Sequence, residues 1–241
     1  ANLPSLTSLE LSNNGLNDIS GFKNGFTNLD HLQLAHNKIS DISSLSGLTK
    51  LWLLKCDHNQ IKNEQLIHLA KLTNLHALEL SSNQITDITP LALLTNLTNL
   101  NVISNKISDL KPLSSLLKLE RLELGENQIT KVDGLDNLTQ LKYLKLQLNQ
   151  IKDVTKLSKL KKLEELRLEG NPDLTVSQIE ELQKALPDCK ITHNADSGTP
   201  NSPAAKAAIE AAIRKAAGKP TGELTKADLE KVTRLVLPNP K

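Results

Sequence analysis

Aliphatic residues recur along most of the chain in a fixed order, and each unit carries an asparagine at the same point. Residues 75–88 read Leu-His-Ala-Leu-Glu-Leu-Ser-Ser-Asn-Gln-Ile-Thr-Asp-Ile, which is the pattern LxxLxLxxNxIxDI. Copies begin at intervals of 22–24 residues, at Leu6, Leu29, Leu51, Leu75, Leu97, Leu119, Leu141 and Leu163. One unit has too little apolar surface to offset the entropy of ordering it. The pattern therefore predicts about eight units stacked side by side around one core.

Each unit predicts a short strand followed by a turn. Leu78 and Leu80 flank a single residue, and this alternation is typical of a strand whose Leu side chains point inward. An amide side chain at the end of the strand can bond turn backbone that would otherwise be unsatisfied. All eight units have an asparagine there: Asn14, Asn37, Asn59, Asn83, Asn105, Asn127, Asn149 and Asn171. The remainder of each unit, such as residues 89–94, is short enough to indicate a 3₁₀ or single-turn segment.

These motifs resemble the 22-residue class of leucine-rich repeats, as in bacterial internalins and the leucine-rich regulatory subunit of protein phosphatase-1. The resemblance covers about residues 3–193. It implies a right-handed α/β solenoid with a parallel sheet on the concave face and short 3₁₀ or α segments on the convex face. Such folds are usually binding surfaces. The resemblance also favours a bacterial origin and a secreted or cell-surface location.

Several segments depart from the plain unit. In the first unit, Phe22 and Phe26 replace leucines and are expected in the core. The third unit is longer, and residues 63–72 predict an α-helix capped by Asn63. After the last repeat, residues 175–186 predict a capped amphipathic helix, and 190–192 a closing strand. Residues 1–193 are therefore interpreted as one array that includes its closing helix.

The end of the chain has a different composition. Residues 194–203 are typical of a linker, and 204–241 predict a helical segment that ends in a repeat-type strand at 232–237. The order of elements in 204–241 resembles the cap that precedes bacterial arrays of this class. Three alternatives remain: the tail begins a second array, docks on the first repeat of another molecule, or packs on the C-terminal end of its own array. The chain also begins in mid-repeat and contains no Met, which favours a fragment of a longer protein.

Composition narrows the possible functions. The net charge of +2 is too balanced to indicate nucleic acid or a membrane surface as a partner. No apolar run approaches the ~18 residues of a spanning helix. Cys56 falls at a core position and Cys189 is expected at the end of the array, so no disulfide is predicted. There is no phosphate-binding loop, no nucleophile elbow and no supported carboxylate pair, so we expect neither catalysis nor a cofactor.

The variable strand positions form the candidate functional site. Trp52 and Tyr143 are the only Trp and Tyr, and both fall at exposed positions of the sheet beside Leu53 and Ile103. Apolar residues that are surrounded by charges on a solvated face are typical of binding anchors. The predicted protein-binding residues are His31, Trp52, Leu53, Lys55, Asp57, His76, Glu79, Ile103, Arg121, Glu123, Tyr143 and Lys145. The expected partner is an unidentified protein, with a host or cell-surface protein as one candidate and self-association through the 204–241 tail as the alternative.

Histidines are concentrated in the second to fourth units. His31, His36, His58 and His76 occur there, near Asp57. His36 and His58 hold the same position in adjacent units, so they should lie about 5 Å apart. This spacing allows shared metal binding or a pH-sensitive contact. The favoured interpretation is polar residues on a solvated sheet, and no metal site is predicted.

Overall fold

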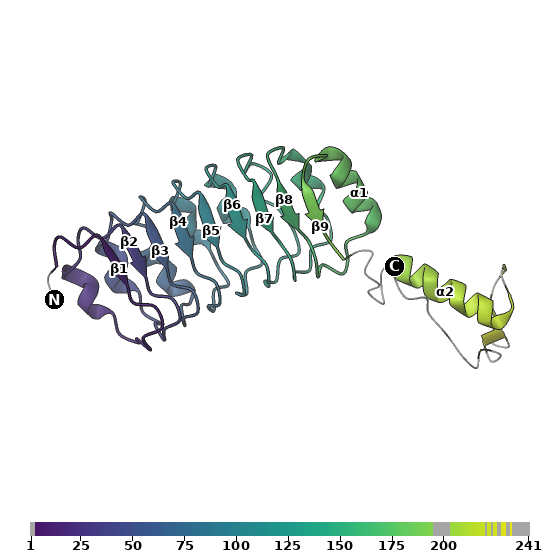
Figure 1. Ribbon diagram of the computed structural model, residues 1–241, viewed down its shortest axis with the longest axis horizontal. Helices are drawn as coiled ribbons and strands as arrows, with labels where there is room; N and C mark the ends of the chain where they lie inside the picture. Colours follow the sequence, from purple (N-terminus) through teal and green to yellow (C-terminus); the bar gives the residue numbers. More distant parts are fainter. Residues whose placement is uncertain are drawn as a thin grey trace.

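Nine short strands form one parallel sheet whose strand order follows the chain (Figure 1). The computed structural model describes residues 3–194, 203–219, 221–222, 224–225, 228–229 and 232. The strands are β1 Ser8–Glu10, β2 His31–Gln33, β3 Leu53–Lys55, β4 Ala77–Glu79, β5 Asn99–Asn101, β6 Arg121–Glu123, β7 Tyr143–Lys145, β8 Glu165–Arg167 and β9 Lys190–Thr192. Equivalent residues of adjacent repeats are opposite one another, as Leu54 is to Leu78. The predicted solenoid with its sheet on the concave face is confirmed.

The convex side consists mainly of 3₁₀ helices, as the short second half of each unit predicts. They are η1 Ser20–Asn24, η2 Ser43–Gly47, η3 Asn63–His68, η4 Thr89–Leu93, η5 Lys111–Ser115 and η6 Thr155–Lys159. Between β6 and β7 the chain instead turns at Gly134, whose φ is +95°. A Cβ at this residue would lie 2.7 Å from the carbonyl oxygen of Leu110. Glycine is required here by both the backbone angle and the close approach to the preceding repeat.

The core is a continuous aliphatic column between the sheet and the convex segments. The middle leucines of β2 to β8 are all buried. Phe22 is buried and Phe26 partly buried, with ring centroids 4.9 Å apart, which confirms both as core residues. Cys56 and Cys189 are buried and free, as expected. Burial raises the pKa of the Cys189 thiol to about 11, which keeps it protonated and unreactive at neutral pH.

The asparagines form the predicted ladder. The Nδ2 of Asn105 donates to the carbonyl oxygens of Leu80, Val102 and Ile103 at 3.0, 3.1 and 3.2 Å. Its Oδ1 accepts the N–H of Ile85 at 3.0 Å. One buried side chain thus satisfies backbone groups of its own repeat and of the preceding one. Because a buried backbone group without a partner is costly, each asparagine fixes the join between two turns.

The α-helix predicted over residues 63–72 is wrong. The chain forms the 3₁₀ helix η3, with Lys62 at its N-cap and no side-chain cap. Asn63 instead binds the next repeat: its Nδ2 donates to the Thr86 Oγ1 at 2.7 Å, and its Oδ1 accepts the N–H of Thr86 at 2.7 Å and of Asp87 at 3.1 Å.

The leucine spacing of this segment explains the difference. The three leucines here, Leu66, Leu69 and Leu72, are buried and three apart, and Ala70 is buried beside them. A leucine spacing of three is the period of a 3₁₀ helix, whereas an α-helix would rotate successive leucines away from the core.

The C-terminal end of the array is covered by α1, Val176–Ala185, and by β9. Thr175 accepts the N–H of Gln178 in a reciprocal capping box, while Ile179 and Leu182 are buried. A further helix, α2, spans Pro203–Ala217. Between and beyond these helices, the linker residues 195–202 and nearly all of the strand expected at 232–237 lie outside the described residues. The three alternatives for the tail, and the division of the chain into domains, therefore stay predictions. None of the helices in the described part of the chain is long and apolar enough to cross a membrane.

Candidate protein-binding surface

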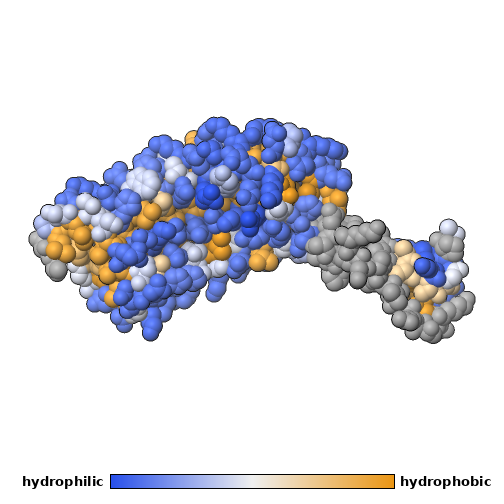
Figure 2. Space-filling view, viewed as in Figure 1, coloured by the Kyte–Doolittle hydropathy of each residue, from blue (hydrophilic) through white to orange (hydrophobic). Residues whose placement is uncertain are grey.

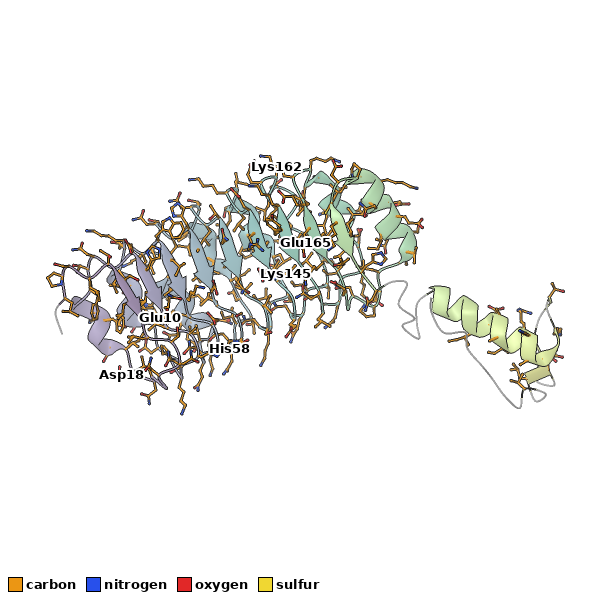
Figure 3. The ribbon with its side chains drawn as sticks, in the orientation of Figure 1. Glu10, Asp18, His58, Lys145, Lys162 and Glu165 are labelled. Carbon is orange, nitrogen blue, oxygen red and sulfur yellow. The ribbon has the colours of Figure 1, made fainter. Side chains whose placement is uncertain are left out.

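The concave face, defined as the exposed and partly exposed residues of β1 to β9 with those directly before each strand and up to two positions after it, carries all twelve predicted binding residues. In β2, β3, β4, β6 and β7 the middle residue is buried and the two outer residues are partly exposed. Figure 3 shows Glu10, Lys145 and Glu165 over this sheet. Figure 2 shows apolar patches lying among predominantly hydrophilic side chains.

Eight of the twelve residues lie on the strands themselves, and four flank them: Trp52 and His76 precede strands, and Asp57 and Ile103 follow them.

Trp52 lies between two histidines of the neighbouring repeats. Its ring centroid is 5.6 Å from that of His31 and 5.4 Å from that of His76, with interplanar angles of 30° and 17°. Hydrogen bonds position both imidazoles: His31 Nδ1 lies 2.7 Å from Asp30 Oδ1, and His76 Nδ1 lies 2.8 Å from the carbonyl oxygen of Asn74. Trp52 remains 43% exposed. The stack therefore holds a large aromatic surface in place without covering it.

Beside the Trp52 stack the concave face has a hollow of about 470 Å³. Ala77 and Asn99 are small residues at the first position of β4 and β5, and they lie between the larger Leu53 and Arg121 of the flanking strands. A run of short side chains between long ones produces a depression in an otherwise even sheet. Trp52 forms part of its wall.

Ion pairs connect adjacent repeats around this hollow. The Nζ of Lys55 lies 2.9 Å from Glu79 Oε1, and the Nζ of Lys145 lies 2.8 Å from Glu123 Oε2. Arg121 NH1 is 3.7 Å from the other oxygen of Glu123. The hydrogen bond to Glu79 raises the pKa of the Lys55 ammonium. These pairs place charges of both signs at fixed points around the hollow.

Tyr143 is more constrained than Trp52. The guanidinium carbon of Arg121 lies 4.2 Å from the centre of its ring, a cation–π contact. The Tyr143 hydroxyl donates to Glu164 Oε2 at 2.8 Å, and this hydrogen bond raises the pKa of the phenol. Its polar end is therefore already occupied by Glu164, and one face of its ring contacts Arg121.

The four histidines divide into two groups at opposite ends of the strands. His31 and His76 stack on Trp52 where the strands begin. His36 and His58 stack on each other after the strands end, with centroids 4.1 Å apart and an interplanar angle of 12°. Only this second pair approaches Asp57. The expectation that all four lie near Asp57 is wrong for His31 and His76.

The prediction from sequence missed the floor of the hollow. Ala77, Asn99 and Asn101 line it, but they are neither apolar anchors nor charges and so gave no signal by residue type. The available signal was their order: the first strand position runs Leu53, Ala77, Asn99, Arg121 through four successive repeats. Small residues between large ones in one column indicate a depression once neighbouring strands are known to be in register.

Models of leucine-rich repeats match the chain in three places. The repeat region of leucine-rich repeat and WD repeat-containing protein 1 matches residues 85–217. A two-copy leucine-rich repeat model matches residues 4–47, and a single-repeat model matches 71–88. Together with the nine-stranded sheet, these matches define a leucine-rich repeat protein, a class whose members generally mediate protein–protein interaction.

Similar solved structures indicate which kind of leucine-rich repeat protein this chain resembles. An internalin (inlF) of Listeria monocytogenes is 38% identical with a TM-score of 0.73, and the match covers 77% of this chain and 54% of that one. Internalin C2 (inlC2) of the same species is also 38% identical with a TM-score of 0.65, covering 68% of this chain and 71% of that one. Rat lumican is 43% identical over 61 residues, which are 25% of this chain and 18% of lumican. The chain belongs to the leucine-rich repeat family and is an internalin-like member of it.

Proposed function

We propose that the concave face binds a protein partner without catalysis, and that the partner inserts an apolar side chain into the hollow between Trp52 and Arg121. The observation that carries this proposal is the hollow itself, a depression of about 470 Å³ next to a half-exposed indole. Binding hot spots favour a central aromatic anchor beside a pocket that the partner can dehydrate. The small floor residues Ala77 and Asn99 leave room for an aliphatic or aromatic side chain.

Rigidity of the surface supports the same proposal. Trp52 is stacked on both sides, and Arg121 is held between Glu123 and the ring of Tyr143. Ordering a rotamer-rich side chain on binding costs about 0.5–1.5 kcal/mol. A surface whose side chains are already fixed by contacts between repeats loses little of this entropy. The partner therefore gains affinity from pre-organisation as well as from contact area.

The chemistry of the sheet supports binding rather than catalysis. Its carboxylates, such as Glu79 and Glu123, are paired with lysines and keep part of their side chains exposed. A general acid or base needs a pKa moved toward neutrality, which usually requires burial. Paired, partly solvated carboxylates instead provide charge register for a docking protein.

Two substitutions test the proposal. A partner is recovered from cell-surface extracts on the immobilised array, and its affinity is measured for the parent, for Trp52→Ala and for Tyr143→Ala. Trp52→Ala should weaken binding by about 30-fold or more, the loss typical of a central aromatic hot spot, and Tyr143→Ala by less because its hydroxyl is already engaged. Both variants should fold as the parent does.

The matched control is Leu93→Ala, which removes a 60% exposed apolar side chain from the convex helix η4. It should leave the affinity unchanged. A partner that binds both concave variants as tightly as the parent, or that is lost in the convex control, would show that the binding surface lies elsewhere.

A further inference from the structure

His36, Asp57 and His58 form a compact cluster at the edge where the strands of the sheet end, and Figure 3 labels His58 there. One ligating atom from each residue lies within 4.8 Å of the other two. The two imidazoles are stacked with an interplanar angle of 12°. Two imidazoles and one carboxylate are thus gathered from two adjacent repeats.

The backbone fixes the positions of these three residues. His36 and His58 have φ values of 53° and 52°, a left-handed conformation that ends each strand in the same way. The N–H of His36 donates to the carbonyl oxygen of Asp57 at 2.9 Å, and the N–H of His58 to that of Ser81 at 2.8 Å. Since equivalent residues of a parallel ladder repeat at the strand spacing of about 4.8 Å, the two rings have to lie side by side.

The carboxylate of Asp57 supplies an independent observation. Its Oδ1 is buried and has no hydrogen-bond partner among the described residues. The nearby cation Lys55 is paired with Glu79 at 2.9 Å and so does not satisfy it. A buried carboxylate oxygen without a donor is costly and is expected to have a partner that the protein chain itself does not provide.

We propose that His36, Asp57 and His58 bind a divalent transition-metal ion of the zinc class. Imidazole nitrogens with one carboxylate suit Zn²⁺, Co²⁺, Ni²⁺ and Cu²⁺, whereas Ca²⁺ and Mg²⁺ prefer oxygen ligands alone. Three protein ligands leave one position of a tetrahedral ion open, here toward solvent because both histidines are exposed. The site joins the second and third repeats and does not depend on the proposed partner-binding hollow.

Only side-chain rotation is needed to close the site. Zn–N and Zn–O bonds of about 2.0–2.2 Å bring tetrahedral ligand atoms to roughly 3.4 Å from each other. The ligand atoms now lie within 4.8 Å of one another, so an approach of at most about 1.4 Å brings them to this distance. Both imidazoles are on the surface, and among the described residues their rings are engaged only in the mutual stack. Turning them toward Asp57 therefore breaks no hydrogen bond.

The site is tested by titrating the untagged chain with ZnCl₂ and, separately, with CoCl₂. The parent should bind one equivalent of Zn²⁺, and Co²⁺ should give the visible absorption of a tetrahedral ion. His36→Asn and His58→Asn should each weaken Zn²⁺ binding by more than about tenfold. Asparagine tolerates the left-handed backbone and already occupies the equivalent position as Asn13, so both variants should fold. Asp57→Ser, which places there the residue found at Ser81 in the next repeat, should weaken binding to a similar degree.

The matched control is His76→Asn, which removes a histidine from the other end of the strands and should bind Zn²⁺ as the parent does. Thermal unfolding provides a second readout: Zn²⁺ should raise the midpoint of the parent and of His76→Asn but not of His58→Asn or Asp57→Ser. No binding by the parent, an equal loss in the control, or unchanged binding in all three ligand variants would overturn the proposal.

Discussion

Asn101 and Asn105 lie in the same repeat, four residues apart, and the chain uses them in opposite ways. Asn105 is buried, bonds backbone groups of two repeats, and has an equivalent in every unit. Asn101 lies on the concave face at the edge of the hollow, where its Oδ1 accepts one local N–H, that of Ile103 at 3.1 Å. In this fold the position within the unit, rather than the residue type, decides whether a side chain supports the array or is available to a partner.

The same contrast holds for the whole interior and the whole concave face. Leu54, Leu78 and Leu100 are one residue type at the middle of three successive strands, and each is buried. The residues on either side of them vary from lysine to glutamate to asparagine without a change in backbone register. The interior must be nearly identical in each repeat because each repeat packs on the next. The face carries no such requirement, so it can encode recognition.

The largest expected effect comes from Asn105→Ala. The substitution leaves the N–H of Ile85 buried without a partner and removes one hydrogen bond from each of three carbonyl oxygens, which keep a second donor. An unsatisfied buried group costs about 1–3 kcal/mol and each lost bond about 0.5–1.5 kcal/mol, so the array should lose on the order of 4 kcal/mol of unfolding free energy. The comparison variant Asn101→Ala should lose less than about 1 kcal/mol. Urea denaturation of the three proteins measures both changes, and equal losses would refute the division between interior and face.

Next in size is Leu100→Ala. Leu100 is 1% exposed, so its truncation leaves a cavity between β4, β5 and β6 and should cost about 2–5 kcal/mol. Ile103→Ala removes a partly exposed aliphatic side chain of the same repeat and should cost about 1 kcal/mol or less. The unfolding midpoint of each variant checks this ranking. A loss for Ile103→Ala as large as that for Leu100→Ala would mean that the face contributes to the core.

The smallest effect is the coupling between Lys55 and Glu79. A double-mutant cycle with alanine at both positions should give about 0.2–1 kcal/mol, because the side chains are 32% and 35% exposed. Added salt should reduce it. The pKa of Lys55 is raised above its ordinary 10.5, so this contribution is fully present at neutral pH and is lost as the pH rises through the folded value. A coupling energy that persists in high salt at neutral pH would indicate that the Lys55–Glu79 pair is more buried than its exposed fractions imply.

Much of the architecture could be predicted because the same pattern of leucines and asparagine occurs in eight successive units. The period predicted the strands, the Asn ladder and the 3₁₀ segments, and the capping residue Thr175 indicated α1. The α-helix predicted at residues 63–72 was wrong. Asn63 is a residue type that often caps an α-helix, but here it does not act as a cap. The spacing of three between Leu66, Leu69 and Leu72 indicates the 3₁₀ helix that forms, whereas the asparagine at residue 63 indicates the start of an α-helix.

The candidate site was only partly predictable. The alternation of the strands places Leu53 and Tyr143 on the concave face, and Trp52 occupies a variable position directly before its strand; these placements follow from the sequence alone. The hollow does not, because it depends on which side chains of adjacent repeats become neighbours and on how long each one is. Residues such as Ala77 and Asn99 have meaning only beside Leu53 and Arg121.

The sequence by itself determined the stack of repeats, its aliphatic core and the face that the chain exposes, because a periodic pattern can bury its leucines in only one way. The tertiary structure decided what that face contains. Contacts such as Trp52 between two imidazoles, or His36 against His58, join residues 21–24 positions apart in sequence. Their geometry arises from the register of adjacent strands and the rotamers that neighbours allow, and a linear pattern of residue types specifies neither.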